Sequence, residues 1–128
     1  MITMQDYLKG RDKQYPKDFT EEIVKHATVV LERANALLGA ASLVRGCNSG
    51  WRPYTVQMEV NPRAPNSKHV TGDAIDIEDK DGKLKEWIKQ NPSILDKLDL
   101  YMEHPDSTPT WVHVQIVPPR SKSRVFRP

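Results

Sequence analysis

Two histidines and one aspartate are the residues of this chain whose types and spacing best suit chemistry. His69 and Asp76 lie seven positions apart, with Gly72 between them, and His113 lies far downstream. Two imidazoles and one carboxylate form a ligand set suited to a catalytic zinc ion, whose fourth position stays open for water. The sequence therefore predicts a site for one zinc ion, and the chain would then be a small metallohydrolase.

Two predicted strands could bring these ligands together. Residues 74–77 alternate, so that Asp76 lies on the face opposite to the two isoleucines. Residues 111–117 form a second predicted strand, in which His113 and Gln115 share one face. Side by side, two such strands would present both ligands to one cleft. The first histidine would enter from the preceding loop, where a glycine allows a tight turn.

A hydrolase also needs residues that act on water and on the substrate. Glu103, at the end of a predicted strand over 100–103, is the best candidate for a general base that passes a proton from water to the leaving amine. Arg52 could point a fixed cation at the developing oxyanion or at a substrate carboxylate. Ser67 and Trp111 are further candidates for substrate contacts.

Other reactive residue types have simpler interpretations. His26 falls within a long predicted helix and is expected to be structural or exposed. His104 is interpreted as a loop residue, a substrate contact or an alternative ligand. Trp51 and Trp111 are more often packing or cleft-wall residues than recognition elements. Cys47, the single cysteine, cannot form an internal disulfide and is expected to be a buried structural thiol.

Length and composition favour a single domain spanning residues 1–128. The negative mean hydropathy of −0.65 and the lack of any apolar run of about 18 residues exclude a membrane span. No basic region followed by an apolar stretch opens the sequence, so we expect cytoplasmic synthesis without a signal peptide. A net charge of +2 is too small to indicate binding to nucleic acid.

The basic C-terminal tail, residues 118–128, departs from this balance. It has no acidic residue, and its basic residues are Arg120, Lys122, Arg124 and Arg127. One interpretation is a solvated tail that packs Val125 and Phe126 onto the body of the domain. The other is a surface for an anionic partner such as a cell-wall polymer.

The periodicity of the remaining segments predicts helices around a sheet. A long amphipathic helix is expected from Asp18, which has capping-box spacing to Glu21, to a C-terminal cap at Gly39. The other predicted segments are an amphipathic element followed by a polar loop over residues 1–17, a strand over 42–47, a polar loop over 54–68, and helices over 83–91 and 93–98. Helices and strands that do not strictly alternate favour an α+β domain, with a central antiparallel sheet flanked by helices.

The ligand pattern resembles that of a known family. Ser67-x-His69-x-x-Gly72-x-Ala74-x-Asp76, followed by Trp111-Val-His113, is similar to the pattern of the zinc D-alanyl-D-alanine carboxypeptidases. That family also includes vancomycin-resistance D,D-dipeptidases and bacteriophage L-alanyl-D-glutamate endopeptidases. The segment Gly50-Trp51-Arg52-Pro53 looks like the arginine-bearing turn upstream of the first ligand, and the resemblance covers roughly residues 45–117.

The resemblance implies a zinc ion on His69, Asp76 and His113, a peptidoglycan stem or cross-bridge peptide as substrate, and Arg52 as a substrate or transition-state contact. It also implies a hedgehog/D,D-peptidase-like fold. Separately, we expect the protein to be a monomer. The short chain and its basic closing segment look like phage-encoded members. We therefore expect a phage or prophage lysin that acts on the cell wall after release or as part of a phage particle.

One position departs from the family pattern. Many members carry the catalytic glutamate three residues before the last histidine ligand, where this chain has Thr110, which cannot act as a base. Glu103 would then serve from further upstream, with Asp106 as a weaker substitute. The alternative is a non-catalytic zinc-stabilised binding or structural module of the same fold. Residues 54–66 and 104–109 are expected to form the cleft walls that decide which bond is cut.

Overall fold

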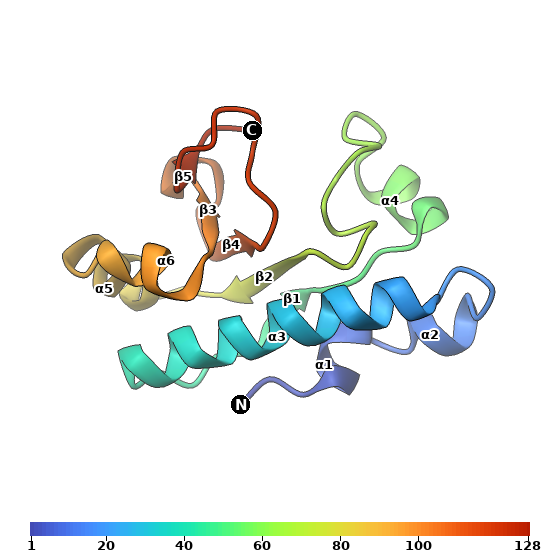
Figure 1. Ribbon diagram of the computed structural model, residues 1–128, viewed down its shortest axis with the longest axis horizontal. Helices are drawn as coiled ribbons and strands as arrows, with labels where there is room; N and C mark the ends of the chain where they lie inside the picture. Colours follow the sequence, from blue (N-terminus) through green and yellow to red (C-terminus); the bar gives the residue numbers. More distant parts are fainter.

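Five strands of this α+β domain form one mixed sheet, with helices packed around it (Figure 1). The computed structural model describes residues 1–128. In chain order the elements are helices α1 (Met4–Leu8), α2 (Arg11–Gln14) and α3 (Glu21–Ala41), strand β1 (Cys47–Ser49), helix α4 (Tyr54–Val60), strand β2 (Ala74–Glu78), helices α5 (Lys83–Gln90) and α6 (Ser93–Leu98), strand β3 (Tyr101–Glu103), the short 3-10 helix η1 (Pro105–Ser107), and strands β4 (Trp111–Gln115) and β5 (Val125–Phe126). No helix has both the length and the apolar character that crossing a membrane requires.

The sheet is antiparallel at its centre and parallel at one edge. Its strand order is β1-β2-β4-β3-β5; the first three neighbouring pairs are antiparallel, and β5 runs parallel to β3. The predicted antiparallel sheet is therefore confirmed at the centre and wrong at this edge. The cause is the connection over residues 116–124, which reverses the direction of the chain after β4. Strand β5 therefore runs opposite to β4 and parallel to β3.

Helix α3 covers one face of the sheet (Figure 1). The core residues of these elements are Ala27, Val30, Leu31, Ala34, Leu37 and Leu38 on α3 and Ile75, Ile77, Val112 and Val114 on β2 and β4. Burying each branched side chain contributes about 1.5–3 kcal/mol. Because successive strand residues point to opposite faces, this packing turns Asp76 and His113 to the other face of the sheet.

The ends of α3 differ from those predicted. The helix begins after Thr20, whose hydroxyl accepts a hydrogen bond from the Ile23 amide, while Asp18 belongs to the preceding turn. The predicted capping box at Asp18 is therefore wrong. At the other end the helix runs through Gly39 and stops at Ser42, which adopts the left-handed conformation with φ 56°. Local hydrogen bonding thus ends the helix later than the glycine indicated.

Three further segments have a structure that differs from the one predicted from the sequence. Of the predicted strand over 42–47 only its last residue joins β1, the predicted polar loop over 54–68 begins with α4, and the loop within residues 1–17 contains α2. Helix α4 starts directly after Pro53, whose ring fixes a φ of −54°, and the next proline, Pro62, lies beyond the helix end. The prolines therefore bound a helix that the loop prediction missed. Helices α5 and α6 match their predicted spans to within one residue.

Candidate metal centre

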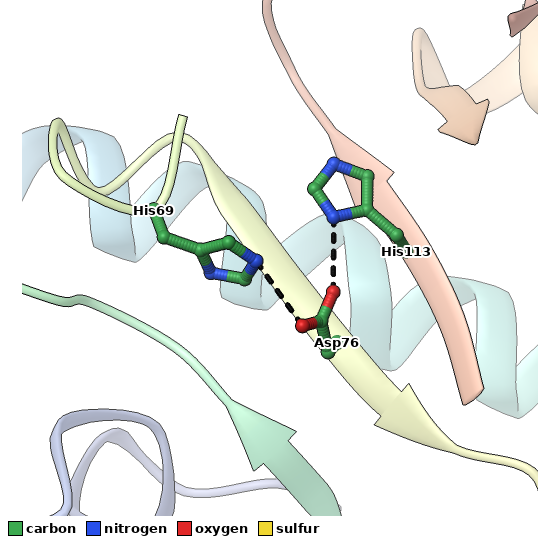
Figure 2. A group of neighbouring side chains, drawn as sticks. All are labelled: His69, Asp76 and His113. Atoms are coloured by element: carbon green, nitrogen blue, oxygen red, sulfur yellow. Dashed lines mark hydrogen bonds and ion pairs between the residues drawn. The ribbon is translucent and has the colours of Figure 1, made fainter. Parts of the chain in front are cut away.

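Three buried side chains converge on the sheet face that α3 leaves uncovered. Asp76 on β2 and His113 on β4 are direct cross-strand partners, and His69 reaches them from the turn before β2 (Figure 2). One Asp76 oxygen, Oδ2, lies 3.2 Å from His69 Nε2, and the other, Oδ1, lies 2.9 Å from His113 Nδ1. Their ligand atoms all lie within 4.8 Å of one another. The structure thus brings the three predicted ligands together in a group that could hold a metal ion.

The turn that carries His69 depends on Gly72. This glycine has a φ of +77°, a conformation that side-chain-bearing residues rarely adopt. A Cβ there would lie 3.2 Å from the Ile23 carbonyl oxygen on α3. The turn can therefore lie directly against the helix, and the chain then enters β2 with Asp76 facing the histidine.

The ring of His69 has a fixed proton position. Its Nδ1 lies 2.7 Å from the carbonyl oxygen of Gly50. A carbonyl can only accept a hydrogen bond, so Nδ1 carries the proton of the neutral ring, and Nε2, which faces Asp76, is the nitrogen that a metal ion would bind. A second hydrogen bond of this kind is the usual way in which proteins orient a metal-binding histidine.

The ring of His113 is oriented by Gln115 in the same way. Its Nε2 lies 2.9 Å from Gln115 Oε1, and the amide nitrogen of Gln115 donates to the Val117 carbonyl at 2.7 Å. Because the nitrogen of the amide is committed to Val117, its oxygen faces the ring and accepts the proton of Nε2. Nδ1 of His113, which donates to Asp76 Oδ1 at 2.9 Å when the ring is protonated, is then the nitrogen that a metal ion would bind after its proton is lost. Sequence reasoning placed Gln115 on this face but did not identify this role.

The nitrogen lone pairs of His69 and His113 and the carboxylate of Asp76 are buried close together, and they would repel one another unless a cation or a proton lay between them. Burial opposes protonation of His113, yet the hydrogen bond and charge of Asp76 prevail and raise its pKa above the usual value. Burial lowers the pKa of His69 despite the charge of Asp76. Burial also disfavours ionisation of Asp76, but the charges and hydrogen bonds of both histidines hold its pKa well below the usual range.

These residues fit a zinc ion. Nitrogen and carboxylate oxygen are ligand types that zinc takes, and three protein ligands leave one position for water or substrate. In the absence of metal, a proton on His113 is the charge that balances the carboxylate. A divalent cation would replace this proton.

A cleft of about 700 Å³ opens over the three ligands. It is lined by Arg52, Gln57, Val60, Asn61, Ala64, Asn66, Ser67, Lys68, His69, Asp76, Glu103, Trp111, His113, Gln115, Pro119, Phe126, Arg127 and Pro128. The lining includes the three predicted ligands together with the other leading candidates, Arg52, Ser67, Glu103 and Trp111. Ser67 also accepts a hydrogen bond from the His69 amide at 3.3 Å, so it shapes the turn as well as the cleft.

Glu103 lies beside the ligand group. The register of β3 and β4 pairs Met102 with Val114, so one step further Glu103 stands opposite His113. Its Oε2 lies 3.8 Å from His113 Nδ1. Burial raises the pKa of Glu103, with the charge of His113 opposing and that of Asp76 adding to the rise. A raised pKa makes this carboxylate a stronger base than an exposed glutamate.

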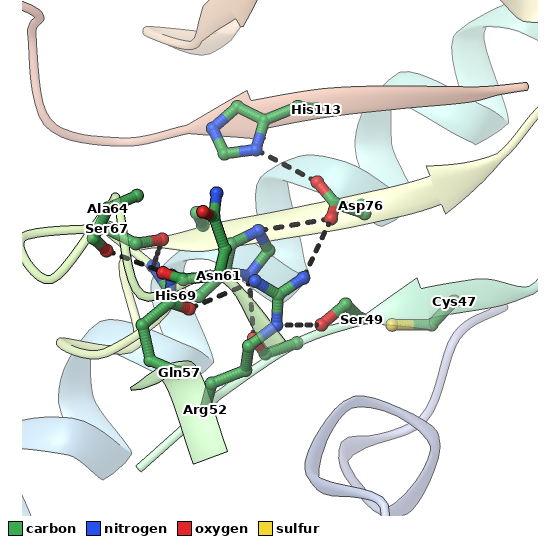
Figure 3. A network of polar contacts seen from close by, with 12 residues as sticks. Cys47, Ser49, Arg52, Gln57, Asn61, Ala64, Ser67, His69, Asp76 and His113 are labelled. Atoms are coloured by element: carbon green, nitrogen blue, oxygen red, sulfur yellow. Dashed lines mark hydrogen bonds and ion pairs between the residues drawn. The ribbon is translucent and has the colours of Figure 1, made fainter. Parts of the chain in front are cut away.

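Arg52 is held on the opposite side of Asp76 by a polar network (Figure 3). Its Nη2 lies 3.4 Å from Asp76 Oδ2. Its Nε donates to Ser49 Oγ at 2.8 Å, and its Nη1 donates to Gln57 Oε1 at 3.0 Å. Gln57 in turn donates to the Ala64 carbonyl at 2.9 Å. Sequence reasoning missed Ser49 and Gln57, although Ser49 pairs with Asp76 across the sheet.

Five other residues considered in the sequence lie outside the cleft lining. Thr110, at the family's glutamate position, is exposed, and Asp106 has 74% of its side chain exposed. His104 caps the η1 helix rather than joining the ligands, and Trp51 is buried in the core. Cys47 is half-buried, and burial raises the pKa of its thiol to about 11.

The cleft walls are only partly those predicted. Residues from 54–66 line one side, as expected, but no residue of 104–109 does. The C-terminal tail supplies that wall instead, with Phe126 lying edge-on to His113 at 6.3 Å between ring centroids. Backbone bonds of 2.6 Å from the amides of Met102 and His104 hold the tail to β3. The predicted packing of Phe126 is confirmed, whereas Val125 is 40% exposed.

Comparisons of the chain with protein-family models, curated proteins and solved structures return no match.

Proposed function

We propose that this chain is a zinc-dependent peptidase of the hedgehog/D,D-peptidase-like fold that cleaves stem or cross-bridge peptides of peptidoglycan. The observation that carries the proposal is the convergence of two oriented imidazole nitrogens and one carboxylate at the floor of a cleft. Hydrogen bonds from the outer nitrogens orient both rings so that their inner nitrogens face Asp76, which a merely structural pair of histidines does not require.

Zinc bound by His69, Asp76 and His113 would polarise a carbonyl and lower the pKa of water toward ~7. Glu103 takes the proton of the attacking water, because its carboxylate lies beside the ligand group and its pKa is raised. It then delivers that proton to the leaving amine. Arg52 holds its guanidinium beside the site through fixed partners and stabilises the negative charge that develops on the carbonyl oxygen.

The substrate class rests on the sequence pattern around the ligands. Ser67-x-His69-x-x-Gly72-x-Ala74-x-Asp76 resembles peptidases of the bacterial cell wall, including phage enzymes. The cleft is consistent with a peptide, since side-chain amides of Gln57, Asn61 and Asn66 line it beside Lys68 and Arg127. We accordingly propose a phage or prophage lysin that acts as a monomer.

Mass spectrometry of peptidoglycan fragments tests this function. Purified fragments are incubated with zinc-loaded protein, with chelated protein and with Asp76→Ala. A product formed only by the zinc-loaded chain supports the proposal, and its mass identifies the bond: loss of a terminal D-alanine indicates a carboxypeptidase, and release of a stem peptide an endopeptidase. No product from several wall chemistries, with zinc bound, would contradict it in favour of a non-catalytic zinc-stabilised module.

A further inference from the structure

Helix α3 makes a polar contact with the turn that carries the first ligand. His26 Nδ1 lies 3.0 Å from the Thr71 carbonyl oxygen and 3.2 Å from Asp73 Oδ1. Because the carbonyl can only accept, Nδ1 carries a proton that these two oxygens share. The contact joins a helix residue far back in the chain to the segment between His69 and Asp76.

Asp73 is the buried end of this contact. It is 5% exposed, and its side chain has two polar partners, His26 and the Thr71 hydroxyl, which donates to Oδ2 at 2.6 Å. The backbone of Asp73 is tied on both sides: its amide donates to the Lys68 carbonyl at 2.9 Å, and its carbonyl accepts from the Ile116 amide at 3.0 Å. The Asp73 carboxylate therefore bonds within its own turn, to Thr71, and also to α3, through His26.

The turn and the helix approach each other closely at this place. Gly72 lies against the Ile23 carbonyl on α3, and His26 is three positions further along the same helix. His69 stands near one end of this turn, and Asp76 follows the other end within β2. A shift of the turn along α3 would therefore change the separation of His69 Nε2 and Asp76 Oδ2, which is 3.2 Å.

We infer that His26 and Asp73 are positioning residues that hold the His69 turn against α3 and thereby set the affinity of the site for its metal. Neither residue belongs to the ligand group or lines the cleft. The inference rests on metal binding at the site, as proposed above, and is independent of which peptide bond the protein cleaves. Loss of a hydrogen bond made directly to a metal ligand typically lowers metal affinity about 10–100-fold. His26 and Asp73 act one step further out, through the turn, so the expected loss lies at or below the lower end of this range.

The test compares His26→Ala with His26→Asn. The asparagine amide nitrogen occupies nearly the place of Nδ1 and can donate the same hydrogen bond, whereas alanine cannot. Zinc affinity is measured by competition with a chelator, and the visible spectrum of the cobalt-substituted protein reports ligand geometry. We expect His26→Ala to weaken zinc binding by up to about tenfold and to alter the cobalt spectrum, and His26→Asn to restore most of both.

Two more variants keep the test decisive. Glu22→Ala is the matched control, because Glu22 approaches His26 only at 3.8 Å from the solvent side. Thr71→Val removes the second partner of Asp73 without touching α3 and should also weaken zinc binding. Wild-type affinity and cobalt spectrum in both His26→Ala and Thr71→Val would overturn the positioning role alone. Absence of zinc binding by the wild-type chain would overturn the proposed metal centre as well.

Discussion

At the scale of single residues, proton positions decide what the site can do. The Gly50 carbonyl and the Gln115 amide oxygen each accept a hydrogen bond from the outer nitrogen of a histidine, which turns the inner nitrogens of both rings toward Asp76 as the candidate ligand atoms. Glu103 stands next to this group without belonging to it. A substitution at Glu103 can therefore remove the proposed base without removing a candidate metal ligand.

Replacing Glu103 with glutamine should abolish peptide cleavage and leave zinc bound. The amide keeps the shape of the side chain but cannot take a proton, so we expect the rate to fall by about 10²–10⁴-fold. Product formation and zinc content are measured on the same preparation. Glu78→Gln is the control, because Glu78 also ends a strand of this sheet but does not line the cleft. A cleavage rate near wild type in Glu103→Gln would rule out this base.

Cys47 should react slowly with thiol reagents. Only the thiolate is nucleophilic, and burial raises the pKa of Cys47 from 9.0 to about 11. At pH 8 the thiolate fraction, and with it the alkylation rate, should be about a hundredfold below that of an ordinary cysteine. The rate should climb about tenfold for each pH unit until it levels near pH 11. Timed alkylation across pH, with unfolded chain as reference, checks this; labelling at equal rates would contradict it.

At the scale of elements, α1 is part of the support for the metal centre. Tyr7 is fully buried and donates from its hydroxyl to the Ala74 carbonyl at 3.0 Å, at the start of β2. The Tyr7 carbonyl and ring also lie against Gly50, so closely that a Cβ there would overlap them. Gly50 in turn orients the ring of His69. The five-residue helix α1 thus helps to position the candidate ligand His69 through its contact with Gly50.

Gly50→Ala should weaken both stability and metal binding. The added methyl group must displace Tyr7 or the strand end, which typically costs about 1–3 kcal/mol of unfolding free energy. The movement also disturbs the hydrogen bond to His69, so zinc affinity should fall about 10–100-fold. Thermal unfolding and chelator competition measure the two effects. Gly39→Ala is the control, since no atom lies within 4 Å of its added Cβ inside α3. Wild-type values for Gly50→Ala would refute this support role.

The sequence predicts the ligands better than their supports for a physical reason. Histidine and aspartate at these spacings, on strands with clear alternation, indicate both the ligands and the face that they share. The role of Gln115 depends on which way its amide turns, and that of Gly50 depends on contact with Tyr7, which lies far away in the chain. Such long-range contacts leave no local pattern in the sequence.

The same limit explains which elements were missed. Strands β2, β3 and β4 and helices α5 and α6 have strong local periodicity, and their predicted positions are confirmed. Helix α4 is short, polar and bounded by prolines, which resembles a loop in composition. Strand β5 has two residues and gains its backbone partners only from β3, so its place in the sheet could not be read from the tail.

At the scale of the whole molecule, the two ends of the chain close around the sheet from different sides. The first helix supports the ligand turn, and the C-terminal tail forms one wall of the cleft. Arg124 anchors this wall: it bonds Asp96 and Asp99 at 2.9 Å each and lies 4.3 Å from the centre of the Tyr101 ring. Part of the positive charge of the tail is therefore paired with acidic residues of the domain.

Arg124→Ala should loosen the tail without unfolding the domain. It removes two exposed ion pairs and one cation–π contact, each worth up to about 1 kcal/mol. The amides of Met102 and His104, which bond to the tail, should then exchange with solvent about tenfold faster. Hydrogen exchange measures this, with Lys122→Ala as control because Lys122 forms none of the domain's ion pairs. Equal protection in both variants would contradict the anchoring role.

Zinc titration of metal-free protein shows whether His69, Asp76 and His113 form a metal site. Native mass spectrometry and calorimetry of the wild-type chain, Asp76→Asn and Asp106→Asn give stoichiometry and affinity. The convergent lone pairs predict one zinc ion per chain for the wild type and for Asp106→Asn, which alters an exposed carboxylate. Asp76→Asn should lose tight binding. A wild-type chain that binds no zinc, or an Asp76→Asn variant that binds it equally well, would show that these three residues do not form a zinc site.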